Sequence, residues 1–216
     1  MTKLYILNTA DINKANIEKL ITSLPFGETE RQRLLSIANA DRMRESLGGL
    51  VALWRLCSLC DICLPLNICR TDTGKPYFVG NSPPTFGISH SCGFAAAAID
   101  TSGAPLGLDT ELIRKGLHTE QIAQRFFTDQ EKRAFSEQNS TDECFFRIWT
   151  AKEARAKLEG VGLSSIINSN DKDGAKTTWQ QIIEIGEKRL YIAICQKQTV
   201  TSVDIITDEG QSYKQS

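Results

Sequence analysis

Two acidic residues interrupt an apolar segment that has the length of a β-strand. Asp109 and Glu111 stand two positions apart within residues 106–112. Because successive side chains of a strand point to opposite faces, both carboxylates should lie on one face. Such a pair suits a hard divalent cation such as Mg²⁺, which completes its coordination with water and phosphate oxygens. An edge strand that turns this face to water would explain the pair equally well.

Three further groups of residues could take part in the same chemistry. Glu153 and Lys157 are four positions apart in a helical pattern that ends at Gly160. They predict either a surface ion pair or a third carboxylate beside a cation that neutralises phosphate. Gly74-Lys75-Pro76 is a turn with one cation, and Ser89-His90 offers a hydroxyl and an imidazole at the polar end of a strand. Each group alone is weak evidence for a site.

The cysteine spacing offers a different chemistry. Cys57, Cys60 and Cys63 follow one another at intervals of three, as at the start of a bacterial ferredoxin motif. The next cysteine, Cys69, comes too late for that motif and is not followed by proline. Apolar residues recur at intervals of three and four around the cysteines, which is typical of a helix that faces a core. We therefore expect these three cysteines to be core thiols and not cluster ligands.

The elements that must position these residues can be read from periodicity and turn signals. The sequence predicts strands at residues 3–7, 86–91, 94–99, 106–112, 179–185, 190–195 and 200–206. It predicts helices at residues 12–23, 28–38, 41–63, 119–127, 129–137 and 142–158. Thr128 is the expected N-cap of the helix at 129–137, with Glu131 in the capping-box position. A turn at residues 101–105 separates two expected subdomains, 1–103 and 104–216, and the fold class is α+β.

Composition limits the classes of protein that need to be considered. The 216 residues include 25 Lys and Arg against 26 Asp and Glu, so the formal net charge is −1. No global field therefore favours nucleic acid or an anionic membrane. With 41% hydrophobic and 24% charged residues, the chain is neither disordered nor fibrous. No apolar run has the length of a bilayer span and none resembles a signal peptide, so we expect a cytoplasmic protein that binds neither nucleic acid nor a membrane.

Taken together and in order, these motifs resemble the 4'-phosphopantetheinyl transferases of the surfactin-synthetase-activator type. The resemblance covers most of the chain. It runs through Arg44, Gly74-Lys75-Pro76, Phe86-Gly87-Ile88-Ser89-His90-Ser91, Gly107-x-Asp109-x-Glu111, Arg125-Phe126-Phe127, Trp149-x-x-Lys152-Glu153-Ala154-x-x-Lys157 and Gly160-x-Gly162-Leu163.

The resemblance implies a fold of two similar α/β subdomains that are related by pseudo-twofold symmetry and enclose coenzyme A between them. It implies a monomeric, magnesium-dependent holo-acyl-carrier-protein synthase, with Mn²⁺ as a substitute metal. Such an enzyme transfers 4'-phosphopantetheine from coenzyme A to a serine of an apo acyl or peptidyl carrier protein and releases adenosine 3',5'-bisphosphate. The basic and apolar residues 114–127 are the expected carrier-binding surface, or else an amphipathic helix with solvated cations.

The resemblance also implies roles for individual residues. Asp109, Glu111 and Glu153 would hold the metal. Arg44, Lys75, Pro76 and His90 would bind the adenosine 3'-phosphate region with Ser89 nearby, and Lys152 and Lys157 would approach the pyrophosphate. Glu153, Lys157 and Asp109 would be the catalytic residues. Thr110 stands between the two acids where many relatives have an apolar residue, so we rank Glu111 below Asp109 and Glu153.

Two other functions fit parts of the sequence. Gly87-Ile88-Ser89-His90-Ser91 differs by one residue from a nucleophile elbow, and Ser89, Asp109 and His118 follow the order of an α/β-hydrolase triad. The final Ser91 in place of glycine and the short chain argue against a serine hydrolase. A protein that binds coenzyme A without catalysis is the second alternative, and the intact Asp109, Glu153 and Lys157 argue against it.

Overall fold

The computed structural model describes residues 1–80, 84–166, 177–197, 200, 202–208 and 212–213. The helices are α1 Ile17–Ser23, α2 Glu28–Leu35, α3 Ala40–Leu59, α4 Thr119–Phe126, α5 Asp129–Glu137 and α6 Asp142–Glu159, with short 3-10 helices at Thr9–Asp11, Lys14–Asn16 and Leu163–Ser165. The strands are β1 Thr2–Asn8, β2 Ile68–Arg70, β3 Pro76–Phe78, β4 Thr85–Ser91, β5 Phe94–Asp100, β6 Leu106–Leu112, β7 Thr177–Ile185, β8 Lys188–Gln196, β9 Val203–Thr207 and β10 Ser212–Tyr213.

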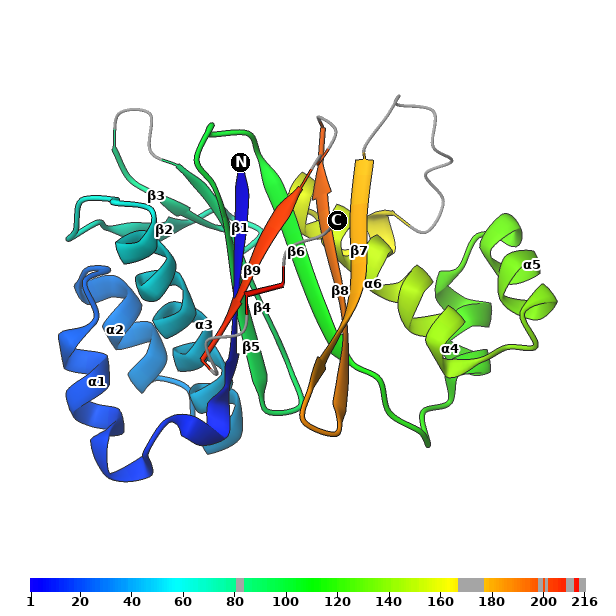
Figure 1. Cartoon of the computed structure of the whole chain (residues 1–216), viewed down its shortest axis with the longest axis horizontal. Helices are drawn as coiled ribbons and strands as arrows, with labels where there is room; N and C mark the ends of the chain where they lie inside the picture. Colours follow the sequence, from blue (N-terminus) through cyan, green and yellow to red (C-terminus); the bar gives the residue numbers. More distant parts are fainter. Residues whose placement is uncertain (81–83, 167–176, 198–199, 201, 209–211, 214–216) are drawn as a thin grey trace.

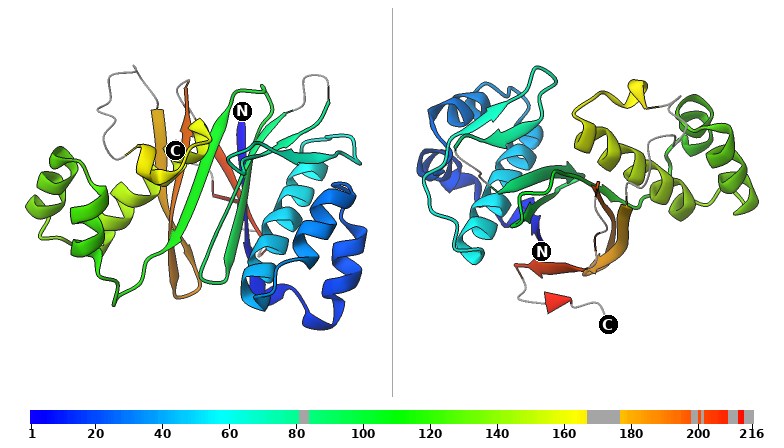
Figure 2. Two further views of the ribbon diagram at one scale, coloured as in Figure 1. Left: turned by 180° about the vertical axis from the view of Figure 1, so that it is seen from behind. Right: turned by 90° about the horizontal axis from the view of Figure 1, so that it is seen from above.

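The strands form two main sheets with mixed α/β packing (Figure 1). One sheet has the order β10-β9-β1-β5-β4, the other has the order β6-β8-β7, and β2 and β3 form a separate hairpin. Helices α1 to α3 accompany the first sheet and α4 to α6 the second, and both groups stand on the same side of the strands when seen from above (Figure 2). Strands β4 and β6 lie next to each other where the two sheets meet.

The expected turn at residues 101–105 does connect the two parts of the chain, between β5 and β6. Strand β9 nevertheless returns to the first sheet, where it pairs in parallel with β1. Its end is held by Asp208, which accepts a hydrogen bond from the Tyr5 hydroxyl and forms an ion pair with Arg55. The division into 1–103 and 104–216 and the pseudo-twofold relation of the halves both stay predictions.

The core has several parts because both faces of the central strand β1 are covered. Tyr5 and Leu7 pack against the apolar face of α3, whereas Leu4 and Ile6 point into a second cluster shared with β6 and β8. This alternation follows from the period of two along a strand. A third cluster of aromatic side chains joins α4, α5 and α6 to β8. Burial of apolar surface on both faces of β1 thus stabilises the packing of the two sheets against each other.

Helix α6 lies directly on β6, and a glycine makes this close approach possible. A Cβ atom at Gly107 would be 2.0 Å from the Ala154 carbonyl oxygen and 2.4 Å from the Leu158 amide nitrogen. Both of these are backbone atoms of α6, so no side chain can rotate away from the clash. The missing side chain at Gly107 therefore sets the distance between the strand with Asp109 and the helix with Glu153.

We predict that Gly107→Ala lowers the free energy of unfolding by about 3 kcal/mol, because α6 must move off the strand. Gly162→Ala is the matched control, since a Cβ atom there would meet only the Ser164 hydroxyl, at 3.7 Å. Its expected cost is below about 1 kcal/mol. Chemical denaturation of both variants measures the difference, and equal costs would contradict the assigned contact.

Most of the predicted helices and strands are present, but some begin or end at other residues than the sequence pattern predicted. Strand β6 and helix α5 have the predicted bounds, and Thr128 and Glu131 form the predicted capping box. The hairpin partner β2 was not expected. Helix α3 ends at Leu59, and α1 is shorter than predicted because residues 9–16 form two 3-10 turns instead.

The prediction that three cysteines are core thiols is wrong for Cys63. Cys57 is fully buried, and burial raises the pKa of its thiol to about 12. Cys60 is the C-cap of α3 and half-buried, and the backbone turns at Asp61, which has a φ of 53°. Cys63 therefore lies beyond the helix and is exposed.

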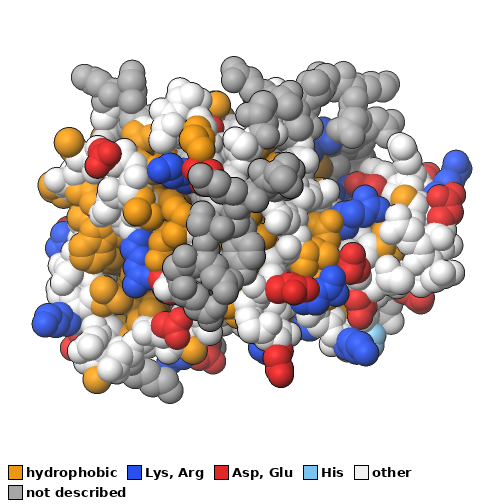
Figure 3. Space-filling view, in the orientation of Figure 1, with side chains coloured by type: hydrophobic (Ala, Val, Ile, Leu, Met, Phe, Trp, Pro, Cys, Tyr) orange, Lys and Arg blue, Asp and Glu red, His pale blue; other side chains and the backbone are white. Residues whose placement is uncertain are grey.

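The described residues contain no helix that is long and apolar enough to cross a membrane. On the face shown in Figure 3, basic and acidic side chains are interspersed, and neither charge gathers in one large patch. The surface view agrees with the formal net charge of −1. Any anion-binding site must therefore depend on a local arrangement of cations.

Candidate active site

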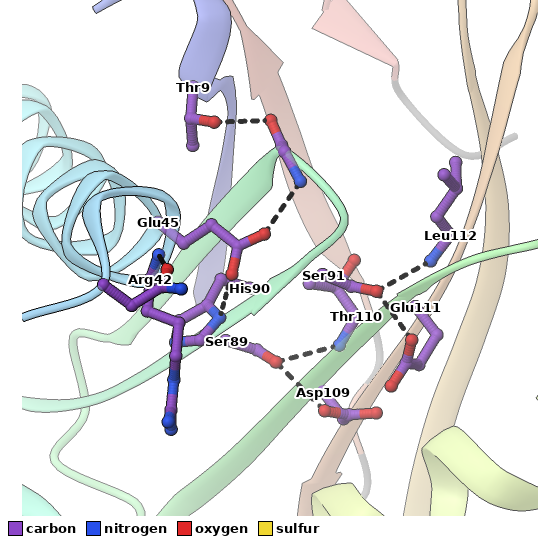
Figure 4. Close-up of polar contacts among 12 residues, drawn as sticks. Thr9, Arg42, Glu45, Ser89, His90, Ser91, Asp109, Thr110, Glu111 and Leu112 are labelled. Carbon is purple, nitrogen blue, oxygen red and sulfur yellow. Dashed lines mark hydrogen bonds and ion pairs between the residues drawn. The ribbon is translucent and has the colours of Figure 1, made fainter.

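The candidate site lies where β4 meets β6, beneath one face of α6. Alternation along β6 places Asp109 and Glu111 on the face toward α6 and directs Thr110 to the opposite side. Glu153 and Lys157 are one helical turn apart on the face of α6 that covers this strand. Strand β4 contributes Ser89 and Ser91 from the other side (Figure 4). The structure thus brings together the residues of motifs that are far apart in the sequence.

Asp109 is the centre of the hydrogen-bond network. It is 4% exposed, and its Oδ1 accepts hydrogen bonds from the Ser89 hydroxyl at 3.0 Å and from Lys157 Nζ at 2.7 Å. Lys157 Nζ also donates to Ser89 Oγ at 2.9 Å. Asp109 Oδ2 is buried and has no hydrogen-bond partner among the described residues. A buried carboxylate oxygen without a partner costs stability unless a ligand binds it, so this atom points to an incomplete site.

The other two carboxylates face the same space. Burial raises the pKa of Glu153, the charges of Asp109 and Glu111 raise it further, and Lys157 opposes the shift. Burial likewise raises the pKa of Glu111. The hydrogen bond from Ser91 lowers this pKa, and the charge of Asp109 raises it by a smaller amount. Such mutual repulsion requires the three charges to be close. A further cation between them would relieve both the repulsion and the burial cost.

A cleft of about 290 Å³ opens beside this carboxylate group. Its walls come from both parts of the chain, since α3 and the β2–β3 hairpin form one side and α6 forms the other. The basic side chains in its lining are Arg33, Arg70, Lys75, His90 and Lys157, and Pro76 also lines it. This local concentration of positive charge suits a ligand with several phosphate groups, although the whole chain is close to neutral.

Lys75 and His90 are each held by contacts with other parts of the chain. Lys75 Nζ donates to the Leu158 carbonyl at the end of α6, 2.7 Å away, and burial lowers the pKa of Lys75. His90 Nδ1 lies 3.2 Å from Glu45 Oε2, and the other oxygen of Glu45 accepts the Gly93 amide at 2.9 Å. Burial lowers the pKa of His90, while Glu45 opposes that shift. Glu45 thereby orients the imidazole (Figure 4), and His90 is one of the residues that line the cleft.

Sequence reasoning missed Arg33 and Arg70 as residues of the cleft. Both are held by Glu30, which is 2% exposed and lies 2.8 Å from Arg33 Nε and 2.8 Å from Arg70 Nε. These two hydrogen bonds and charges outweigh burial and lower the pKa of Glu30. Nothing local in the sequence indicates that Arg33 and Arg70, which are 37 positions apart, share one partner, and only the fold shows that Glu30 holds both beside the cleft.

The structure does not bring Lys152 or Arg44 into this group. Lys152 is 6% exposed and points toward α5, where its Nζ donates to both carboxylate oxygens of Glu131 at 3.0 and 2.8 Å. Arg44 is absent from the cleft lining and lies 3.7 Å from Asp41. Lys152 and Lys157 belong to one sequence motif, but they are five positions apart on α6. Five positions rotate a side chain by more than a quarter turn around the helix axis, so the two lysines lie on different faces of α6.

The donor set suits a hard divalent cation, although no complete metal site is formed. Asp109, Glu111 and Glu153 offer only oxygen donors, which Mg²⁺ prefers, and Asp109 Oδ2 is free to bind. Within the described part of the chain, no three His, Cys, Asp or Glu side chains are close enough to hold a metal ion as they stand. Magnesium usually takes few protein ligands and completes its coordination with substrate phosphates and water.

The geometry argues against a serine hydrolase. Ser89 lies within strand β4 and not at a strand-to-helix turn, and it is 3% exposed. Its hydroxyl contacts Asp109, Lys157 and the Thr110 amide, so no imidazole activates it among the described residues. A nucleophile elbow instead requires an exposed serine beside a histidine base.

Comparison with known proteins identifies the family of this chain. Residues 105–209 match the family model described as the 4'-phosphopantetheinyl transferase superfamily. The chain is 30% identical to the 4'-phosphopantetheinyl transferase AcpT of Salmonella typhimurium over 151 residues, which is 68% of this chain and 75% of AcpT. It is 29% identical to the 4'-phosphopantetheinyl transferase psf-1 of Bacillus pumilus over 177 residues, 77% of this chain and 72% of that relative.

A third relative is a Synechocystis protein whose name assigns it provisionally to the same class. The two chains are 27% identical over 156 residues, 69% of this chain and 60% of the relative, so a substantial part of that protein is not covered. The family model covers β6 and α6, and the match to AcpT extends over three quarters of that relative. The chain belongs to the 4'-phosphopantetheinyl transferase superfamily.

Proposed function

We propose that this protein transfers the 4'-phosphopantetheine group from coenzyme A to a serine of an apo acyl or peptidyl carrier protein and releases adenosine 3',5'-bisphosphate. Its membership of the superfamily supports the reaction class. The single observation that carries the proposal is the group of three carboxylates and Lys157 beside a cleft lined by cations. We further infer a monomer of the surfactin-synthetase-activator type in the cytoplasm.

The cleft supplies binding sites for the phosphates of coenzyme A. Lys75 and His90 would bind the adenosine 3'-phosphate region, together with Arg33 and Arg70. Lys157, at the boundary between the cleft and the carboxylates, would bind the pyrophosphate. Cations on both walls suit a ligand that carries a pyrophosphate and a separate 3'-phosphate. A role for Arg44 at the 3'-phosphate stays a prediction.

Asp109 and Glu153 would hold Mg²⁺ or Mn²⁺, with Glu111 as a third ligand or as a ligand through water. The metal would supply neutralisation of the pyrophosphate charge. Thr110, which had lowered the rank of Glu111, points to the opposite side of β6, so it does not turn Glu111 away from the shared face. The carboxylate oxygens and the unpartnered Asp109 Oδ2 support this assignment.

The protein residues would act mainly by positioning and by moving one proton. The carrier serine oxygen attacks the β-phosphorus, and the bond from this phosphorus to the oxygen of the departing adenosine bisphosphate breaks. Glu153 accepts the serine proton, a role that its raised pKa favours. Lys157 stabilises the negative charge on the departing bisphosphate. Phosphoryl transfer of this kind requires alignment and charge stabilisation more than covalent help from the protein.

The decisive experiment incubates the protein with coenzyme A, Mg²⁺ and a panel of apo carrier proteins and then measures intact masses. We expect one or more carriers to gain the mass of phosphopantetheine. Binding of coenzyme A without a mass gain on any carrier would favour a binding protein without catalysis. Labelling of Ser89 by a serine-hydrolase probe would favour the hydrolase instead.

The segment that follows β6 is the proposed carrier-binding surface. Lys115 and Arg125 are exposed, and the Arg125 guanidinium lies 5.1 Å from the centre of the half-buried Phe126 ring. Phe127 is 2% exposed and belongs to the core, so it cannot contact a partner. The remaining basic and apolar side chains suit the acidic surface that surrounds the modified serine of a carrier.

We predict that Arg114→Glu combined with Lys115→Glu raises the KM for the carrier at least about ten-fold and leaves the KM for coenzyme A nearly unchanged. Steady-state kinetics with each substrate varied in turn measures both constants. Arg114 lies 3.6 Å from Glu111, so the single Lys115→Glu variant is needed to separate carrier binding from an effect on the site. Equal losses for both substrates would assign these residues to coenzyme A.

A further inference from the structure

Serine hydroxyls join β4 to β6 where the two sheets meet without a backbone ladder. The two strands belong to separate sheets. Ser89 Oγ accepts a hydrogen bond from the Thr110 amide at 3.2 Å, and Ser91 Oγ accepts one from the Leu112 amide at 3.3 Å. Both serines are buried, and their spacing of two matches the spacing of the two acids on β6 (Figure 4).

The same hydroxyls also contact the carboxylates that precede those amides. Ser89 donates to Asp109 at 3.0 Å, and Ser91 donates to Glu111 Oε2 at 2.6 Å. A hydroxyl has one proton, and an amide can only donate, so the serine proton must point to the carboxylate. Each serine therefore fixes one strand amide and one carboxylate oxygen at once. The arrangement occurs twice, at successive positions on the same face of β6.

We propose that Ser91 is a positioning residue that holds the Glu111 carboxylate toward the metal-binding space. Glu111 has a longer side chain than Asp109. Lys157 donates a hydrogen bond to Asp109, whereas the hydrogen bond that Glu111 accepts comes from Ser91. Arg114 forms an ion pair with Glu111 at 3.6 Å, and the charges of Asp109 and Lys157 also act on Glu111. The Ser91 hydroxyl is thus the short contact that sets which way this side chain turns.

Ser91 acts through Glu111 and not on the substrate. It is 7% exposed and does not line the cleft. Removal of its hydroxyl would free the Glu111 carboxylate to turn toward Arg114 and leave the Leu112 amide without its partner. Groups that orient a metal ligand commonly change metal affinity by ten-fold or more when they are removed. This inference rests on the metal site of the proposed function.

The test compares Ser91→Ala, Ser91→Thr and the wild type by titration with Mn²⁺ in the presence of coenzyme A, with free Mn²⁺ followed by electron paramagnetic resonance. We expect Ser91→Ala to weaken Mn²⁺ binding by about ten-fold and Ser91→Thr, which keeps the hydroxyl, to restore it to within about three-fold. Ser102→Ala is the matched control, because Ser102 also donates to a carboxylate, that of Asp100, which lies outside the cleft lining. It should leave Mn²⁺ affinity unchanged.

Wild-type affinity in Ser91→Ala, or equally weak binding in Ser91→Thr when both variants melt near the wild-type temperature, would overturn the inference. If the wild type itself binds no Mn²⁺, the metal assignment of the proposed function fails, and a double-mutant cycle of Ser91→Ala with Glu111→Gln then decides the inference. The contact between Ser91 and Glu111 is supported if the unfolding equilibrium constant of the double variant differs about five-fold or more from the value expected when the two single effects are independent. Additive effects overturn it.

Discussion

Replacement of Asp109 by asparagine should lower kcat/KM for phosphopantetheine transfer by a factor of about 100 to 1000 while the protein stays folded. Asparagine has nearly the same shape, so the packing around this position should persist. The change removes the negative charge that pairs with Lys157. It also replaces the carboxylate that would bind the metal with a neutral amide, which is a poorer metal ligand. The loss should therefore fall on charge stabilisation in the transition state. Transfer rates from intact mass, with circular dichroism to check folding, measure the effect.

Thr110→Val is the matched control for this experiment because it changes the adjacent residue of the same strand. The Thr110 side chain is 1% exposed and its hydroxyl makes no hydrogen bond among the described residues. Valine has the same shape without the unpaired hydroxyl, so we expect stability to rise by about 1 kcal/mol and transfer to stay within two-fold. Near wild-type transfer by Asp109→Asn, or a loss in Thr110→Val as large as that in Asp109→Asn, would refute the central role of Asp109.

The largest expected effect on stability is at Lys152. Its ammonium group is almost fully buried and donates to both oxygens of Glu131, which also accepts the Thr128 amide at 2.7 Å in the capping box of α5. Lys152→Met keeps most of the side-chain volume but leaves the Glu131 charge without its cation. Loss of one partner of a buried ion pair typically costs about 3 to 5 kcal/mol, and because the Glu131 side chain is 27% exposed we expect the lower end of this range. Chemical denaturation should show this loss, with the KM for coenzyme A unchanged in the folded variant.

Lys132→Met provides the comparison on the same helix pair. Lys132 lies 3.9 Å from Asp129, whose side chain is 93% exposed, and a pair of this kind contributes less than about 1 kcal/mol. The experiment also decides between two roles for Lys152. A stable Lys152→Met protein with a strongly raised KM for coenzyme A would make Lys152 a phosphate ligand, as the resemblance to the family implied, and would contradict a structural role.

Local patterns in the sequence predicted the strand and the helix that form the candidate site. Alternation placed Asp109 and Glu111 on one face of β6, and a spacing of four placed Glu153 and Lys157 on one face of α6. These periods are set by backbone geometry within a few residues, so they survive in any fold. The residues of the site could therefore be named before their distances were known.

Contacts between distant segments could not be predicted in this way. Nothing near Glu30 in the sequence indicates that it pairs with Arg70, and nothing near Glu45 indicates that it orients His90. The contact of Lys152 with Glu131 was not foreseen, because a motif gives spacing along a helix but not the neighbour on each side, which here is α5. One signal was available but unused: the two-residue spacing of Ser89 and Ser91 equals that of the acids opposite them.

The parallel pairing of β9 with β1 affects how the chain can fold during its synthesis. Strand β1 consists of residues 2–8, but one of its two neighbours is formed by residues 203–207. Until those late residues leave the ribosome, β1 has an open edge of unpaired amides and carbonyls, which is a template for pairing with other chains. Folding from the N-terminus therefore stops at an incomplete first sheet, although α3 can already cover one of its faces. The nascent chain should depend on chaperones, or on rapid synthesis of the second part, more than its modest length suggests.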